Sequence, residues 1–121
     1  MIVGVLGLGL IGGSFARVYP AAGHTVYACE QDKSILDFAS MEGVITAPLT
    51  KENISECDLV LLVVPPQGII DFVREMAPYI GPHPLVLDCC GVKRAVCEAL
   101  FPVAKQYGVS LGLGSGVYWT T

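Results

Sequence analysis

Three glycines near the start of the chain have a spacing that suits phosphate binding. Residues 7–12 read Gly-Leu-Gly-Leu-Ile-Gly, which is the pattern G-x-G-x-x-G directly after a short apolar run. In this pattern Gly7 permits a tight turn, Gly9 lets the backbone approach a pyrophosphate, and Gly12 lets the next helix pack closely on the strand. The pattern therefore predicts a loop that holds the pyrophosphate of a dinucleotide.

The backbone amides that follow this loop would supply the hydrogen bonds. A helix that begins here points the amides near Leu10 and Ile11 at the phosphates. The helix dipole also favours a negative charge at this end. We therefore expect the phosphate side of a cofactor site to consist of Gly7, Gly9, Leu10, Ile11 and Gly12.

An acidic residue follows at the distance where a dinucleotide site holds a ribose. Glu30 lies 18 residues after Gly12, close to the spacing of about 20 that is typical of such sites. A carboxylate at that place accepts hydrogen bonds from the ribose hydroxyls of adenosine and repels a 2′-phosphate. Gln31 is the next residue, and no Arg stands nearby to hold that phosphate. We therefore predict NAD as the cofactor, with NADP disfavoured, and include Gln31 in the site.

Two more segments are predicted to reach the same edge of the sheet, because ligands cross the carboxyl ends of parallel strands. Val64, Pro65 and Pro66 follow a buried strand and would form an apolar wall beside the cofactor. The alternative is that these prolines only end the strand. Gly91 follows a later strand and would let the backbone approach the nicotinamide ring, while Lys93 could point at the site or into solvent.

Short apolar runs alternate with amphipathic stretches along the chain. Strands are predicted over residues 2–6, 25–29, 44–46, 59–64, 85–89 and 109–113. Helices are predicted over residues 11–19, 68–80 and 92–107, with another that Asp32 caps and Gly43 ends, and with a helical turn in 50–56. Buried strands that alternate with helices imply right-handed crossovers. The predicted fold is therefore α/β, a doubly wound, mostly parallel sheet with helices on both faces, of the Rossmann type that binds NAD(P).

The composition excludes several classes of protein. Hydrophobic residues make up 53% of the 121 residues and charged residues 15%, against about 25% charged residues in an average domain, so disorder is excluded. The net charge of −4 comes without a basic cluster, which argues against nucleic-acid binding. No apolar run approaches the roughly 20 residues of a membrane span. We therefore expect one domain with a small-molecule substrate and no nucleic-acid or membrane partner.

The five cysteines and two histidines suggest neither a metal site nor a disulfide framework. No C-x-x-C pair is present, and Cys89 and Cys90 are adjacent. His24 and His83 have no ligand spacing. We expect reduced thiols in a cytoplasmic protein. A reactive Cys90 is the alternative, because a thiol near a helix start can have a lowered pKa.

With these residues the chain resembles the amino-terminal domain of the prephenate and arogenate dehydrogenase family. The resemblance rests on Val5–Ser14, Glu30, Asp58–Pro66 and Asp88–Lys93, and it covers roughly residues 1–110. It implies an oxidoreductase that uses NAD or NADP to oxidise and decarboxylate prephenate to 4-hydroxyphenylpyruvate, a step of tyrosine biosynthesis. The family is also known to form homodimers through a helical carboxyl-terminal domain.

The chain departs from this family where catalytic groups are expected. Gly91 stands where the family often has Ser or Thr. After the sixth strand the family has a Gly-x-His-Pro-Met stretch, whose His accepts a hydrogen bond from the substrate hydroxyl. Residues 113–119 contain no His, and His83 lies at the wrong end of a strand. The catalytic residues of this chain therefore remain unassigned.

The resemblance implies a division of the chain and an incomplete enzyme. Residues 1–110 would form the dinucleotide-binding domain and residues 111–121 a divergent Gly-rich tail. The helical substrate and dimer domain would be absent, so we expect the chain to bind NAD and to catalyse little alone. Two alternatives stay open: a stand-alone module that binds NAD and acts through a partner, and another Rossmann reductase that acts on imino or hydroxy acids.

Overall fold

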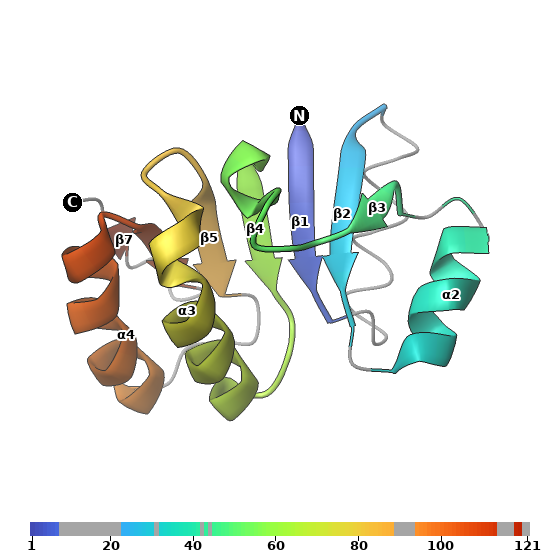
Figure 1. Cartoon of the computed structure of the whole chain (residues 1–121). Helices are drawn as coiled ribbons and strands as arrows, with labels where there is room; N and C mark the ends of the chain where they lie inside the picture. The colour runs from blue at the N-terminus through green and yellow to red at the C-terminus, as the bar shows by residue number, and fades with distance from the viewer. Residues whose placement is uncertain are drawn as a thin grey trace.

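The computed structural model describes residues 1–7, 23–30, 32–41, 43, 45–88, 94–113 and 118–119. Within these ranges the chain forms one twisted sheet with helices packed on it (Figure 1). The strands are β1 (Ile2–Leu6), β2 (Thr25–Cys29), β3 (Ala47–Pro48), β4 (Leu59–Leu62), β5 (Leu85–Asp88), β6 (Ser110–Leu113) and β7 (Tyr118–Trp119). The helices are α2 (Lys33–Met41), α3 (Pro66–Ile80) and α4 (Arg94–Tyr107), with a short 3-10 helix, η1 (Ile54–Glu56).

The strand order identifies the topology. The seven strands lie in the order β3-β2-β1-β4-β5-β6-β7. Among the described strands, all neighbours from β3 to β6 are parallel and β7 runs antiparallel, with Leu111 opposite Trp119. The chain moves outward from β1 in one direction, then returns to β4 on its other side, so the order reverses between β1 and β4. A reversal of this kind is the switch point of a doubly wound sheet.

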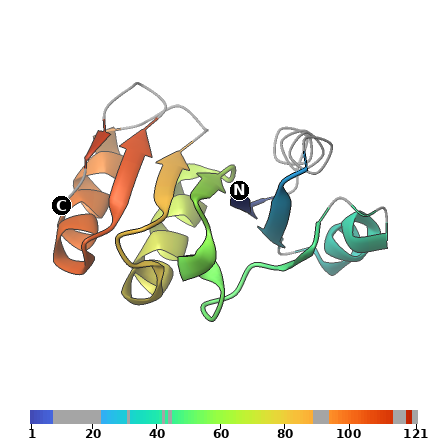
Figure 2. The ribbon, with the colours of Figure 1, turned by 90° about the horizontal axis from the view of Figure 1, so that it is seen from above.

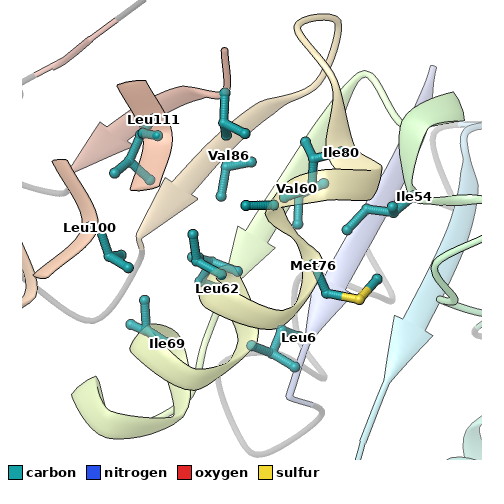
Figure 3. Packing of buried hydrophobic residues seen from close by; sticks show 14 of the residues in the cluster. Leu6, Ile54, Val60, Leu62, Ile69, Met76, Ile80, Val86, Leu100 and Leu111 are labelled. Atoms are coloured by element: carbon teal, nitrogen blue, oxygen red, sulfur yellow. The ribbon is translucent and has the colours of Figure 1, made fainter. Parts of the chain in front are cut away.

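One apolar cluster lies between the sheet and the pair α3 and α4. Successive side chains of a strand point to opposite faces, and Val60 and Leu62 of β4 point into this cluster (Figure 3). Ile69 of α3 and Leu100 of α4 are fully buried against them. Each such side chain contributes about 1.5–3 kcal/mol when it leaves water, so this cluster holds the two helices on the sheet.

A second apolar cluster lies on the opposite face. It contains Val3, Val5, Val26, Ala28, Ile45 and Leu61, each at most 6% exposed. Both faces of the sheet are therefore covered. Seen from above, α2 lies on the β2–β3 side of the molecule, away from α3 and α4 (Figure 2). The prediction of a doubly wound, mostly parallel α/β sheet is confirmed.

The third strand was predicted at the wrong residues. The β-branched residues at 44–46 favoured a strand there, but β3 is Ala47–Pro48, paired with Tyr27 and Ala28. Thr46 only begins the pairing: its N–H donates to the Val26 carbonyl at 2.7 Å. The contact with β2, rather than local propensity, therefore sets this short edge strand.

The fourth strand is shorter than predicted, because the chain leaves the sheet before its prolines. β4 ends at Leu62 rather than at residue 64, and α3 begins at Pro66 rather than at residue 68. Pro65 is the N-cap of α3, and its carbonyl accepts the N–H of Gly68 at 2.9 Å and of Ile69 at 3.2 Å. Proline suits the first helical turn, where no N–H partner is needed.

Other predicted elements agree with the structure to within a residue or two. Asp32 caps α2, since its Oδ1 accepts the N–H of Ser34 at 2.9 Å. β6 begins at Ser110 instead of residue 109, and β7 was not predicted. The predicted helix over 11–19 lies outside the described residues, as do Cys89 and Cys90. None of the described helices is both long and apolar enough to cross a membrane.

Candidate cofactor-binding site

A cavity of about 630 Å³ opens at the switch point of the sheet. It lies where β1, β2 and β4 end, beside the first half of α3, which is where an open α/β sheet binds ligands. Its volume is within the range of ligand pockets, roughly 300–1,000 Å³. The described lining residues are Leu6, Gly7, Cys29, Glu30, Val64, Pro65, Gly68, Asp71, Phe72 and Glu75.

Gly7 forms the turn that brings the chain from β1 to the cavity. Its φ of +92° is in the left-handed region, and its N–H donates to the Cys29 carbonyl at 2.8 Å. A Cβ on Gly7 would lie 2.5 Å from the Val63 carbonyl oxygen and 2.8 Å from Val64 Cγ1. Only glycine fits this conformation and this space. The fold itself thus requires the first glycine of the pattern, whatever the loop binds.

Glu30 follows β2 directly and lies on the wall of the cavity. Its Oε2 accepts the N–H of Asp32 at 3.1 Å, and Asp32 in turn accepts the N–H of Ser34. These two hydrogen bonds tie the acidic residue to the start of α2. The carboxylate is therefore held at the carboxyl edge of the sheet by the local backbone.

The wall beside Glu30 is apolar. Val64 is half-buried against the cluster under α3, and Pro65 caps that helix. Gly68 lets the first turn of α3 pack close to Val64, because a Cβ on Gly68 would lie 3.0 Å from Val64 Cγ2. Phe72 continues the wall one turn later. A flat ring could pack on this surface while its polar edge faces the carboxylate of Glu30.

Part of the predicted site is brought together here. Gly7, Glu30, Val64 and Pro65 all line the one cavity. Pro66 begins α3, and its side chain lies outside the described set. The other predicted site residues also lie outside the described ranges: Gly9, Leu10, Ile11, Gly12, Gln31 and Gly91.

Sequence reasoning missed the contribution of α3. Gly68, Asp71, Phe72 and Glu75 line the cavity although none follows a strand directly. Their spacing of three to four residues is a signal for one helix face. The sequence shows such a face on α3 but does not show that the face turns toward the end of β2.

The electrostatics of the cavity are negative. Glu30, Asp71 and Glu75 line it, and no Lys, Arg or His stands among the described lining residues. Burial raises the pKa of the Cys29 thiol, and the charges of Glu30 and Glu75 raise this pKa further. Carboxylates from β2 and α3 thus act on the same thiol, which keeps its proton at neutral pH.

The two histidines lie at the opposite edge of the sheet. His83 Nε2 is 2.8 Å from Asp58 Oδ1, while Asp58 Oδ2 accepts the N–H of Ile2 at 2.8 Å. These two bonds hold the pKa of Asp58 below its usual value, and the bond from Ile2 has the larger effect. His24 Nδ1 is 3.2 Å from the amino group of Met1. As predicted, His83 belongs to the loop at the amino end of β5.

The other polar groups do not form a metal site. Within the described ranges, no group of three or more His, Cys, Asp or Glu side chains is arranged to hold a metal ion. Cys29 and Cys57 are both free thiols. Burial raises the pKa of Cys57 to about 11, with Asp58 and Glu56 adding to the shift.

A doubly wound parallel sheet with a cavity at its switch point defines a nucleotide-binding domain of the Rossmann type. The family model described as prephenate dehydrogenase, nucleotide-binding domain, matches residues 15–109. The chain belongs to this family, which confirms the resemblance inferred from its motifs.

Named relatives agree with this assignment. The T-protein of Haemophilus influenzae is 27% identical over 117 residues, which are 97% of this chain and 26% of that protein. Synechocystis arogenate dehydrogenase is 26% identical with a TM-score of 0.76. Prephenate dehydrogenase from A. aeolicus, in complex with hydroxyphenyl propionate and NAD⁺, is 19% identical with a TM-score of 0.75. Each of these two matches covers 92% of this chain and 40% of the solved one.

Proposed function

We propose that this chain binds NAD at the switch-point cavity, as the dinucleotide-binding part of a prephenate or arogenate dehydrogenase. The observation that carries the proposal is the position of Glu30, a carboxylate held at the end of β2 on the wall of that cavity. Family membership supports the nucleotide, and the relative solved with NAD⁺ has the same fold. The match covers 26–40% of the relatives' lengths, so the activity of a whole enzyme is part of the proposal.

The lining residues fit the adenosine half of NAD. The apolar wall of Val64, Pro65 and Phe72 offers a surface for the adenine ring. Glu30 can accept hydrogen bonds from the ribose hydroxyls beside it. A 2′-phosphate in the same place would meet the negative charge of Glu30 and no basic lining residue among those described. This environment favours NAD over NADP.

The pyrophosphate side of the site is proposed from the sequence pattern. Gly7 ends β1 at the cavity, and the loop that follows it carries the other residues assigned to the phosphates, Gly9, Leu10, Ile11 and Gly12. Gln31 and Pro66 are assigned to the adenosine side, and Gly91 is assigned to the nicotinamide side. Residues 1–110 are proposed as the dinucleotide-binding unit, and β6 and β7 extend its sheet to Trp119.

The described residues at the cavity are proposed to bind and orient the cofactor. When bound, the nicotinamide ring supplies a hydride acceptor for the oxidation of prephenate or arogenate in tyrosine biosynthesis. A positioned general base contributes typically 10²–10⁴-fold to such a reaction. Both histidines of the chain lie at the amino edge, away from the cavity. We therefore propose that the base is not a histidine of this chain, and that these 121 residues bind NAD⁺ with little turnover.

A calorimetric titration of the 121-residue chain tests the proposal. NAD⁺ is titrated first, and NADP⁺ is titrated under the same buffer and salt. We expect saturable binding with a lower Kd for NAD⁺ than for NADP⁺. Failure to bind either dinucleotide would contradict the proposed site, and a lower Kd for NADP⁺ would contradict the function of Glu30.

A further inference from the structure

One face of α3 forms a wall of the cavity. Gly68, Asp71, Phe72 and Glu75 line the cavity at intervals of three or four residues, which places them on the same side of the helix. The eight residues from Gly68 to Glu75 span about 10 Å along the helix axis. This wall therefore extends well beyond the apolar contact of Val64 and carries two acidic side chains into the region opposite β2.

The two acidic side chains of this wall have no cationic partner among the described residues. Gln67 Nε2 donates to Asp71 Oδ1 at 2.9 Å, and this partner is neutral. Among the described residues, neither Asp71 nor Glu75 forms an ion pair with a Lys or an Arg. Glu75 also raises the pKa of Cys29 at the end of β2. The charge of Glu75 therefore acts across the cavity, on the wall that contains Glu30.

We propose that Asp71 and Glu75 are specificity-determining residues. Together with Glu30, these residues exclude ligands that carry a 2′-phosphate on adenosine. This inference rests on the proposed NAD site. A 2′-phosphate that moved away from Glu30 would approach the acidic wall of α3, because Glu30 and both α3 carboxylates line the one cavity. The preference for NAD therefore has two sources, one on β2 and one on α3, and the loss of Glu30 alone leaves part of it in place.

Coulomb's law gives the size of the effect. Asp71 and Glu75 are exposed, and through a water-like dielectric a carboxylate several ångströms from a phosphate changes binding by about threefold to tenfold. The effect of two carboxylates is then about tenfold or more in the ratio of the two dissociation constants. It decreases with salt, since the screening length falls from about 10 Å at 0.1 M to 3 Å at 1 M.

The test neutralises the α3 carboxylates without changing their shape. The Kd values for NAD⁺ and NADP⁺ are measured by calorimetry for the parent chain, D71N/E75Q, E30Q and the triple variant. We expect D71N/E75Q to shift the Kd ratio toward NADP⁺ by about tenfold, while the Kd for NAD⁺ changes less than threefold. The triple variant should shift the ratio further than E30Q does, and 1 M salt should reduce every shift.

The matched control is E52Q/E56Q, which removes the same two charges from exposed residues beside η1 at the amino edge. We expect its Kd ratio to equal that of the parent chain. Equal ratios for D71N/E75Q and this control would overturn the inference, although NAD⁺ binding would still stand. The single variants D71N and E75Q give the same test if the double variant does not fold. If the parent chain binds no NAD⁺, the proposed function fails and the inference fails with it.

Discussion

The two edges of the sheet use similar residues in different ways. At the amino edge, both carboxylate oxygens of Asp58 contact groups of the chain, because Oδ2 accepts the N–H of Ile2 and Oδ1 contacts His83. At the carboxyl edge, three carboxylates line a cavity from which basic side chains are absent among the described residues. The comparison teaches that an acidic residue at a strand end can serve the fold, as Asp58 does, or line a cavity, as Glu30 does, and that its edge of the sheet separates the two cases.

Backbone conformation separates the same two edges. Gly7 at the carboxyl edge and Gly23 just before β2 both have positive φ, 92° and 86°. A Cβ at Gly7 would collide with the Val63 carbonyl oxygen, whereas a Cβ at Gly23 would meet nothing within 4 Å. The turn into the cavity is therefore fixed by conformation and by space, while the turn at the amino edge is fixed by conformation alone.

The largest effect that tests this comparison is expected from Gly7→Ala. Strain at positive φ and overpacking each cost about 1–3 kcal/mol, so the free energy of unfolding should fall by about 3 kcal/mol. Gly23→Ala should cost only about 1–2 kcal/mol, the price of the left-handed conformation. Urea denaturation of the two variants measures the difference. Equal losses would mean that the crowding at Val63 relaxes without cost.

The next effect concerns the proposed phosphate loop. Gly9→Val should weaken NAD⁺ binding by at least 100-fold, because a branched side chain would stand where the pyrophosphate has to approach the backbone. Calorimetry with NAD⁺ measures the loss, and thermal unfolding of the apo chain controls for folding. If the folded variant keeps its affinity, the glycine pattern serves packing only.

A smaller effect is expected from Glu30→Ala. Hydrogen bonds to a charged group contribute about 1.5–3 kcal/mol, so NAD⁺ should bind about tenfold or more weakly. NADP⁺ should lose less, because the repulsion of its 2′-phosphate decreases at the same time. Calorimetric titrations with both dinucleotides measure the gap. An equal loss for both would exclude Glu30 from contact with the ribose.

The smallest effect belongs to the amino edge and depends on pH. The folded-state pKa of Asp58 lies below its usual value, chiefly through the bond from Ile2 and then that from His83. Its stabilising contribution is therefore present above the unfolded pKa and is lost as the pH falls through the folded pKa. Asp58→Asn should reduce the acid dependence of the urea midpoint below about pH 4. Asp37→Asn, which removes an exposed carboxylate from α2, is the matched control.

Short-range patterns predicted most of what positions the site. β1, β2 and β5 follow from apolar runs, the cap at Asp32 follows from its residue type, and Glu30 was located by its distance from Gly12. Each of these signals depends on a few neighbouring residues. A turn, a cap or a buried strand restricts the backbone locally, so the sequence carries the information directly.

The elements that were missed depend on contacts between distant segments. β3 is placed by its bonds to β2 rather than by the β-branched residues just before it. The acidic face of α3 became part of the cavity only because the helix packs beside the end of β2. β7 pairs through two residue pairs, with Tyr118 opposite Gly112. In each case the local sequence does not carry the long-range contact that places the element.

The two outermost strands, β3 and β7, affect how readily the edges of the sheet pair with another molecule. Each is only two residues long, and β3 contains Pro48, which has no N–H to offer to another strand. Long, flat edges act as templates for pairing between molecules, and proteins counter this with short strands and proline. A chain with 53% hydrophobic residues is a candidate for aggregation. Its described sheet ends on both sides in short strands, which disfavours edge-to-edge pairing between copies.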